Sequence, residues 1–396
     1  MLFKIQRQAG PIQVLAFLIT LVAISRLLFF NMGVTLPLYY GVMFIGMVLC
    51  FSGRNIRYNL YLLVFVYFAY MSILLNDIPS YFLPYDRLIS FLIIVGLVSP
   101  LIAAEKLDNI RLLIFKNINR VFLVLVVLSF LGHFSRIYPG SDWSGFRGVT
   151  NHSMTLGPVA ALAIFLSIDH VFKIDISRQE RYRYLLLAIM SFITMLLAAS
   201  RGAVLGAVLG LFVYFFKKYY LRLGKFLQIT LAVIFIVVAS SGFWSGFTTN
   251  LQRKNAVAQA KGDAAASRSD NWKFRVIEFK ESPLYGIGFS HLKYGLIDKK
   301  SGIVEPASSW LAVFSMTGFL GGIAFTIFIF SILIKLILAK SSQNAVPILL
   351  ALLVFFIVHW FFEGYILASG AFEFFYSWLL LGVIDIYHKT GKVDVL

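Results

Sequence analysis

The chain has 396 residues, of which 60% are apolar and only 13% are charged, and its formal net charge is +17. A soluble domain carries about 25% charged residues, so a soluble globule, a disordered chain and a coiled coil are excluded. An integral membrane protein remains. Its spanning segments are helical, because the apolar runs are continuous and do not alternate as barrel strands do.

Twelve apolar stretches approach the ~20 residues that a helix needs to cross a bilayer. They are 12–30, 34–52, 58–75, 86–104, 119–135, 153–173, 183–199, 202–216, 225–244, 317–339, 345–366 and 371–388. We therefore predict an all-α, polytopic membrane bundle of about 12 transmembrane helices. The run at 202–216 is short for a crossing, and residues 308–316 could form a separate short helix. A long loop between the ninth and tenth spans divides the chain into 1–244, 245–316 and 317–396.

The cations are distributed unevenly along this topology. Twenty of the 35 Lys and Arg fall in segments on one side, namely Lys4, Arg7, Arg54, Arg57, Lys106, Arg111, Lys116, Arg120, Lys173, Arg178, Arg181, Arg183, Lys217, Lys218, Arg222, Lys225, Lys335, Lys340, Lys389 and Lys392. The short loops and span ends on the other side hold Arg87, Arg136, Arg147 and Arg201. The positive-inside rule predicts that both termini are cytoplasmic and that the long loop is on the outer side. Topology then explains most of the charge, and nucleic-acid binding has no independent support.

Two outer arginines depart from this bias. Arg147 lies in a glycine-rich loop, and Arg201 begins the eighth span with almost no loop before it. A fixed cation there needs water, a partner or an anionic ligand, and the helix N-terminus at Arg201 adds amide donors for an anion. We expect a phosphate-binding arginine; the alternative is a side chain that extends to interfacial water. The following Gly202-x3-Gly206-x3-Gly210 stripe predicts close helix packing.

The long loop holds a second candidate group. Arg268, Trp272 and Arg275 are spaced i, i+4 and i+7, so they share one face if the stretch is helical. Guanidinium groups bind phosphate oxygens in pairs, and an indole offers a flat surface for a sugar. The alternative is an amphipathic loop helix without a ligand. Residues 250–271 predict an exposed helix or a mobile flap.

Three glutamates lie near the outer ends of the last spans. Glu305 precedes the tenth span, at the edge of a low-dielectric region that would raise its pKa and suit a general base. The alternative is a solvated loop acid. Glu363 and Glu373 flank the turn at 364–370, where they could bind sugar hydroxyls or, as we expect, pair with outer arginines.

Several kinds of site are missing from the sequence. The single cysteine, Cys50, cannot build a disulfide framework, and there is no Walker loop or Asp-x-Asp motif. The six histidines lack metal-ligand spacing, and His359 is read as a packed residue within its span. We predict no metal, nucleotide or other cofactor.

From about residue 140 to 385 the pattern resembles the O-antigen ligase and polysaccharide polymerase family, the Wzy-type membrane glycosyltransferases. Four pieces carry the resemblance, in an order and spacing that make the set more specific than any one of them. They are Arg147-Gly148 with Asn151-His152-Ser153-Met154-Thr155-Leu156-Gly157; Ser200-Arg201-Gly202; Arg268 and Trp272 with Glu281, Pro283, Leu284, Gly286 and Gly288; and Ser308-Ser309 before Gly318-Phe319-Leu320-Gly321.

The resemblance implies metal-independent glycosyl transfer from a polyprenyl-diphosphate-linked oligosaccharide, at the periplasmic face of a bacterial inner membrane. A flippase and a chain-length regulator are the implied protein partners. Family ligases carry a histidine just before the last-loop helix, where this chain has Glu305-Pro306-Ala307-Ser308-Ser309. This departure favours a polymerase with Glu305 as base, and leaves a ligase acting on lipid A–core, or a transporter without catalysis, as alternatives.

On this reading Arg201 and Arg268 stabilise the leaving diphosphate. The remaining predicted substrate contacts, to the diphosphate or to sugars, are Arg147, Arg275, Asn151, His152, Trp272, Trp310, Ser308, Ser309 and Glu363.

Overall fold

The computed structural model describes residues 10–30, 32–51, 56–135, 145–173, 176–239, 241–260, 268–295, 297–298, 304–339 and 345–396, and within these ranges not the side chains of 232–239, 241, 243 and 258. Its elements are α1 Gly10–Ser25, α2 Leu36–Cys50, β1 Arg57–Tyr58, α3 Leu60–Leu74, η2 Ser80–Phe82, α4 Pro84–Val98, β2 Ile102–Ala103, α5 Glu105–Phe134, α6 Ser153–Val171, α7 Arg178–Ala198, α8 Arg201–Tyr219, α9 Leu223–Ala239, α10 Ser241–Ser245, α11 Thr249–Ala260, α12 Ser269–Glu281, α13 Ser309–Leu338, α14 Val346–Phe362 and α15 Phe372–Thr390. The prediction of an all-α bundle is confirmed. Of the cations used to predict sidedness, Lys4, Arg7, Arg54, Arg136 and Lys340 lie outside the described residues.

Each predicted apolar stretch coincides with a helix. In the described part of the chain, six segments are long and apolar enough to cross a membrane: Ser80–Val98, Glu105–Phe134, Ser153–Val171, Arg178–Ala198, Arg201–Tyr219 and Ser309–Leu338. Four further apolar helices, α1, α2, α3 and α14, are shorter. The run at 202–216, short by sequence, extends to 19 residues as α8. The total of about 12 crossings therefore stays a prediction.

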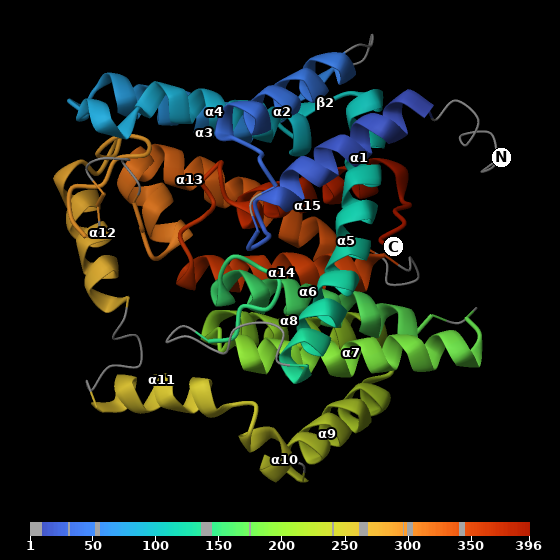
Figure 1. Cartoon of the computed structure of the whole chain (residues 1–396). Coiled ribbons are helices and arrows are strands. Elements are labelled where there is room, and N and C mark those ends of the chain that lie inside the picture. The colour runs from blue at the N-terminus through green and yellow to red at the C-terminus, as the bar shows by residue number, and fades with distance from the viewer. Residues whose placement is uncertain are drawn as a thin grey trace.

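The helices surround a central group formed by α13, α14 and α15 (Figure 1). Helix α14 packs against α8, and α13 packs against α3. A Cβ atom on Gly206 would lie 2.8 Å from the Phe355 ring, and one on Gly202 would lie 3.0 Å from Phe362. The glycine stripe of α8 therefore faces α14 at close range, as predicted, because only residues without side chains allow this approach.

Helix α13 is interrupted at Gly318, whose φ of 69° and ψ of −169° are not helical. The predicted short helix before the tenth span thus exists, as the first part of α13. At this break Phe319 N–H donates to the Pro283 carbonyl (2.7 Å), and the Ser315 carbonyl accepts from Ile287 N–H (2.9 Å). The backbone groups freed by the break are satisfied by residues 283–288, the glycine-containing segment after α12.

The ends of the helices form two groups, at opposite ends of the bundle. At one end Lys389 pairs with Asp108 (3.9 Å) and with Asp385, and Lys116 pairs with Asp394. These residues lie near the start of α5 and at or beyond the end of α15. The opposite end holds the start of α15, the end of α14 and the start of α8. Two of the cations predicted for one side of a membrane, Lys116 and Lys389, therefore lie at one end of the bundle.

Candidate functional site

Backbone contacts hold the segment from Gly145 to His152 at the end of the bundle where α14 ends and α8 and α15 begin. Phe146 N–H donates to the Leu197 carbonyl at the end of α7 (3.1 Å), and Asn151 N–H donates to the Leu27 carbonyl after α1 (2.9 Å). His152 caps α6, its Nδ1 accepting from the Met154 N–H (3.1 Å). These contacts fix Asn151 and His152, two predicted substrate-binding residues, at the start of α6.

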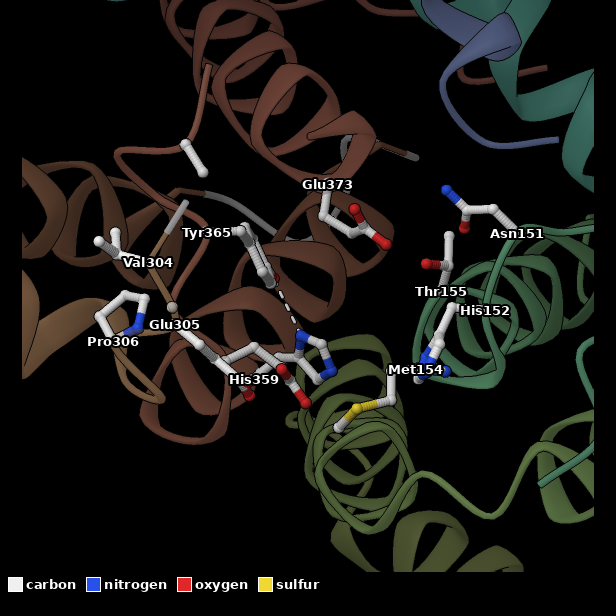
Figure 2. A pocket seen from close by; sticks show the side chains of 13 residues that line it. Asn151, His152, Met154, Thr155, Val304, Glu305, Pro306, His359, Tyr365 and Glu373 are labelled. Carbon is white, nitrogen blue, oxygen red and sulfur yellow. Dashed lines mark hydrogen bonds between the residues drawn. The ribbon is translucent and has the colours of Figure 1, made fainter. Parts of the chain in front are cut away.

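A pocket of about 270 Å³ lies between this segment and the ends of α14 and α15. Its lining residues are Asn151, His152, Met154, Thr155, Val304, Glu305, Pro306, His359, Glu363, Gly364, Tyr365, Ala368 and Glu373. Figure 2 shows Asn151, His152 and Thr155 across the pocket from His359 and Tyr365. Four of the residues predicted to bind or react with substrate therefore meet here, from segments far apart in the sequence: Asn151, His152, Glu305 and Glu363.

Glu363, the first residue after α14, is the best-defined carboxylate of the pocket. Its side chain is 17% exposed and accepts from Arg268 Nη2 at 2.6 Å, so the expected pairing with an outer arginine is confirmed. Burial raises the pKa of Glu363 to about 7; the Arg268 guanidinium acts against this, while Glu373 and Glu305 add to it. A carboxyl group with such a pKa can exchange a proton near neutrality.

Arg268 and Trp272 contact the backbone of the chain segment that follows the lining residues Glu305 and Pro306. Arg268 Nη1 and Trp272 Nε1 both donate to the Ala307 carbonyl, at 3.3 and 3.2 Å. Ala307 has a φ of 60°, an uncommon conformation for a residue with a Cβ. The two predicted residues therefore share one face of α12, as their spacing indicated, and their contact sets the path of the chain after Glu305.

Arg275 does not share this site. Its guanidinium, 1% exposed, forms an ion pair with Glu278 (2.8 Å) and donates to the Tyr294 carbonyl. Burial lowers the pKa of Arg275, and that of Glu278 is raised by burial. The arginine thus fastens the loop at 293–294 to α12, and its predicted contact with the substrate has no geometric support.

Trp310 also lies away from the pocket. Its indole donates to the Ile357 carbonyl (3.1 Å) and packs among Phe325, Trp360 and Phe361. Only 8% of the residue is exposed. The ring is a core residue joining α13 to α14, and it cannot stack on a sugar in this arrangement.

Ser308 and Ser309 act on the pocket through the backbone. Ser308 caps α13, its hydroxyl accepting from Leu311 N–H (3.4 Å). Ser309 donates through its hydroxyl to the Glu363 carbonyl (2.5 Å), and the same hydroxyl accepts from Ile366 N–H (3.2 Å). Both serines are buried and neither lines the pocket. Ser309 positions Glu363, whereas Ser308 contacts Leu311 and the Trp360 carbonyl.

Arg147 and Arg201 lie at the same end of the bundle. Phe146, beside Arg147, bonds to the end of α7, and α8 begins at Arg201, three residues after α7 ends. Gly202 in turn contacts Phe362, which precedes Glu363. Both side chains are half-buried. Neither side chain lines the pocket.

Sequence reasoning assigned no substrate contact to three lining residues, Thr155, His359 and Tyr365. Glu373 was expected to pair with an arginine, but its side chain forms a hydrogen bond with Thr155. His359 was read as a packed residue, although a polar side chain on an apolar helix is itself a signal of a site. Within the described ranges, no three His, Cys, Asp or Glu residues are grouped so as to hold a metal ion.

The comparisons with known proteins agree with the sequence motifs. A family model described as O-antigen ligase matches residues 186–326, which include Arg201, Arg268 and Glu305. The curated proteins give no match to the chain. Over residues 186–326 the chain therefore resembles the O-antigen ligase family, a family of membrane enzymes of glycan transfer. Three of the four motifs lie in this range, and the motif that begins at Arg147 lies outside it.

Proposed function

We propose that the protein is a polysaccharide polymerase that joins oligosaccharide repeat units carried on polyprenyl diphosphate. The acceptor hydroxyl forms a bond to the anomeric carbon of the donor while the bond from that carbon to the diphosphate oxygen breaks. The diphosphate leaves with the electron pair, and the hydroxyl proton passes to a carboxylate. No other reactant is needed, because the activated sugar–diphosphate bond supplies the driving force.

The observation that supports this proposal is a pocket lined by three carboxylates, at the end of the bundle that also holds three of the arginines. Glu305, Glu363 and Glu373 line the pocket. Arg268 is bonded to Glu363, and Arg147 and Arg201 are held at the same end. Proton acceptors and cations are therefore both present at this end of the bundle, and transfer from a diphosphate needs both: a base at the nucleophile and positive charge at the leaving group.

Glu363 is our first choice for the base, in place of Glu305. Glu305 is exposed, whereas Glu363 is largely buried and has a pKa of about 7. A base is most effective when its pKa lies near the working pH. Glu305, at the edge of the same pocket, is the alternative base.

The leaving diphosphate is assigned to Arg201 and Arg147. Arg268 already uses both terminal nitrogens, on Glu363 and on the Ala307 carbonyl, so its role is to position the base. Arg201 also stands at the start of α8, where the backbone N–H groups at a helix N-terminus favour an anion. The aromatic surfaces between apolar helices would accommodate the polyprenyl tail.

The matching family model is described as O-antigen ligase, so ligation of finished glycan to lipid A–core is the second candidate. The sequence favours a polymerase because Pro306-Ala307-Ser308-Ser309 stands where the family's ligases carry a histidine. We further propose that the pocket faces the periplasm of a bacterial inner membrane, with both termini in the cytoplasm. A flippase would deliver the substrate and a chain-length regulator would limit the product.

The test is incubation of the purified protein with defined lipid-linked repeat units, followed by sizing of the products. Ladders that remain on the polyprenyl carrier support the polymerase. Transfer only to added lipid A–core would establish the ligase instead. If no new glycosidic bond forms with either acceptor, a transporter without catalysis is the remaining candidate.

Substitutions then assign the base. Glu363→Gln is expected to remove most of the glycosyl-transfer activity. Glu305→Gln is expected to lower this activity less. Glu281→Gln is the matched control, because Glu281 is exposed and pairs with Lys293 away from the pocket. Equal activity of the Glu363→Gln variant and this control would reject Glu363 as base.

A further inference from the structure

His359 presents an unused ring nitrogen to the pocket. The residue is 1% exposed and lies in the last turn of α14. Its Nδ1 is 2.9 Å from the Tyr365 hydroxyl, the contact drawn as a dashed line in Figure 2. Among the described residues Nε2 has no hydrogen-bond partner, although His359 lines the pocket. A buried polar atom without a partner is costly, which points to a ligand that supplies one.

Counting hydrogen-bond partners indicates which nitrogen carries the proton. If Nδ1–H donated to Tyr365, the Tyr365 hydroxyl hydrogen and the Nε2 lone pair would both lack a partner among the described residues. If the Tyr365 hydroxyl donates to Nδ1, only the Nε2–H group lacks one. Since each unsatisfied buried group costs about 1–3 kcal/mol, we assign the second arrangement. His359 then offers a donor, not a base, to the pocket.

The opposite wall repeats this arrangement. His152 accepts through Nδ1 from the Met154 N–H, so its neutral ring carries a proton on Nε2 as well. The carboxyl groups of Glu305, Glu363 and Glu373 line the same pocket as acceptors. Three carboxylates repel a diphosphate. A lining that offers both donors and acceptors instead matches a sugar, whose hydroxyl groups both donate and accept.

The size of the pocket limits what it can hold. Its volume of about 270 Å³ lies just below the ~300–1,000 Å³ of drug-sized binding sites. This leaves room for one sugar ring and not for an oligosaccharide, so the rest of a glycan must extend out of the pocket.

We propose that this pocket is the subsite for the terminal sugar of the acceptor, and that His359 is a positioning residue whose Nε2–H donates to a hydroxyl group of that sugar. The contact is made to a hydroxyl other than the attacking one, which faces Glu363. His359 thereby selects which hydroxyl group meets the base. This inference rests on the proposed function, because only glycosyl transfer makes the bound sugar an acceptor. Binding of a sugar can nevertheless be tested without transfer.

The binding test uses the full chain in lipid nanodiscs, with methyl glycosides of hexoses and N-acetylhexosamines as sugar probes and inorganic pyrophosphate as the anion probe. Saturation-transfer NMR measures the affinity of each probe. His359→Phe keeps a flat ring without the donor, and His359→Gln restores a donor near the Nε2 position. His291→Phe is the matched control, because His291 is equally enclosed, bonds to the Ile287 carbonyl (2.9 Å) and lies outside the pocket.

We expect His359→Phe to weaken binding of the preferred glycoside about tenfold, the loss expected from one hydrogen bond. His359→Gln should recover most of this affinity, and His291→Phe should leave it unchanged. Pyrophosphate affinity should not differ between His359→Phe and the unmodified protein. Where transfer to a soluble glycoside is measured, His359→Phe should raise the acceptor KM and leave the donor KM unaltered.

Three results would overturn the inference: no glycoside binds, His359→Phe binds glycosides normally, or it loses pyrophosphate to the same extent. The proposed function fails differently. If glycosides bind through His359 but lipid-linked repeats are never joined, the sugar subsite stands and the polymerase does not. If repeat units are joined but the His359 substitutions do not change glycoside affinity, the proposed polymerase is supported and the sugar subsite is rejected.

Discussion

Replacing Arg268 by glutamine should raise the pKa of the Glu363 carboxyl group and shift the pH dependence of transfer. Arg268 Nη2 lies 2.6 Å from Glu363 Oε1, so the charge centres are about 4 Å apart. At an effective dielectric constant of ~20 this attraction is worth up to ~4 kcal/mol, or ~3 pKa units. The two side chains are 13% and 17% exposed, and water at the pocket reduces the expected shift to about one to two units.

The sign follows from the role of the base. A carboxylate accepts a proton only when ionised, so kcat/KM should rise with pH up to the pKa of Glu363, about 7, and level off above it. In the Arg268→Gln variant the rise should move to higher pH by one to two units. Arg268→Lys is the control, because it keeps the charge but not the planar fork, and its profile should move less.

The assay is the rate of transfer at low substrate concentration across pH 5 to 9, each variant normalised to its own plateau. Infrared difference spectra of the carboxyl band measure the same ionisation without turnover. A profile in Arg268→Gln that coincides with that of the unmodified protein would refute the assignment of Glu363 as the titrating base.

Three other substitutions test separate parts of the site. Arg201→Lys should lower kcat about a hundredfold, as loss of a fixed donor at a developing charge does, with unchanged membrane insertion; near-normal polymer in a product assay would contradict its role. Gly318→Ala should lower the melting temperature in detergent by several degrees, because its backbone is essentially restricted to glycine and the new Cβ would lie 2.3 Å from the Leu284 carbonyl oxygen. Gly41→Ala, with open space around it, should not, and equal melting temperatures would reject the argument. Ser309→Ala leaves Ile366 N–H without its partner and should cost ~1–3 kcal/mol of unfolding free energy; a loss of transfer without any loss of stability would instead indicate direct contact with substrate.

Local patterns predicted the elements well. Continuous apolar runs determine helices of membrane length, and the glycines of α8 indicated a close helix contact that Phe355 fills. The pairing of Glu363 with an arginine was also predicted, because a buried carboxylate needs a cation or hydrogen-bond donors. The same reasoning failed for Glu373, whose partner is the Thr155 side chain.

The sequence did not reveal which side chains are buried by contacts between distant segments. Trp310 and Arg275 look like surface groups in the sequence, because an exposed and an enclosed arginine have the same local pattern. Only the folded chain shows that Glu278 and the Tyr294 carbonyl surround Arg275. Likewise, His359 and Thr155 face one pocket only because α14 and α6 meet, and no spacing along the chain encodes that contact.

The break in α13 has a mechanical consequence. A long apolar helix ordinarily bends where its ladder of hydrogen bonds is weakest, but at Gly318 that ladder continues into residues 283–288. A hinge at this point would have to break bonds to two stretches of backbone at once. A displacement of α12 would therefore be transmitted through residues 283–288 to both parts of α13.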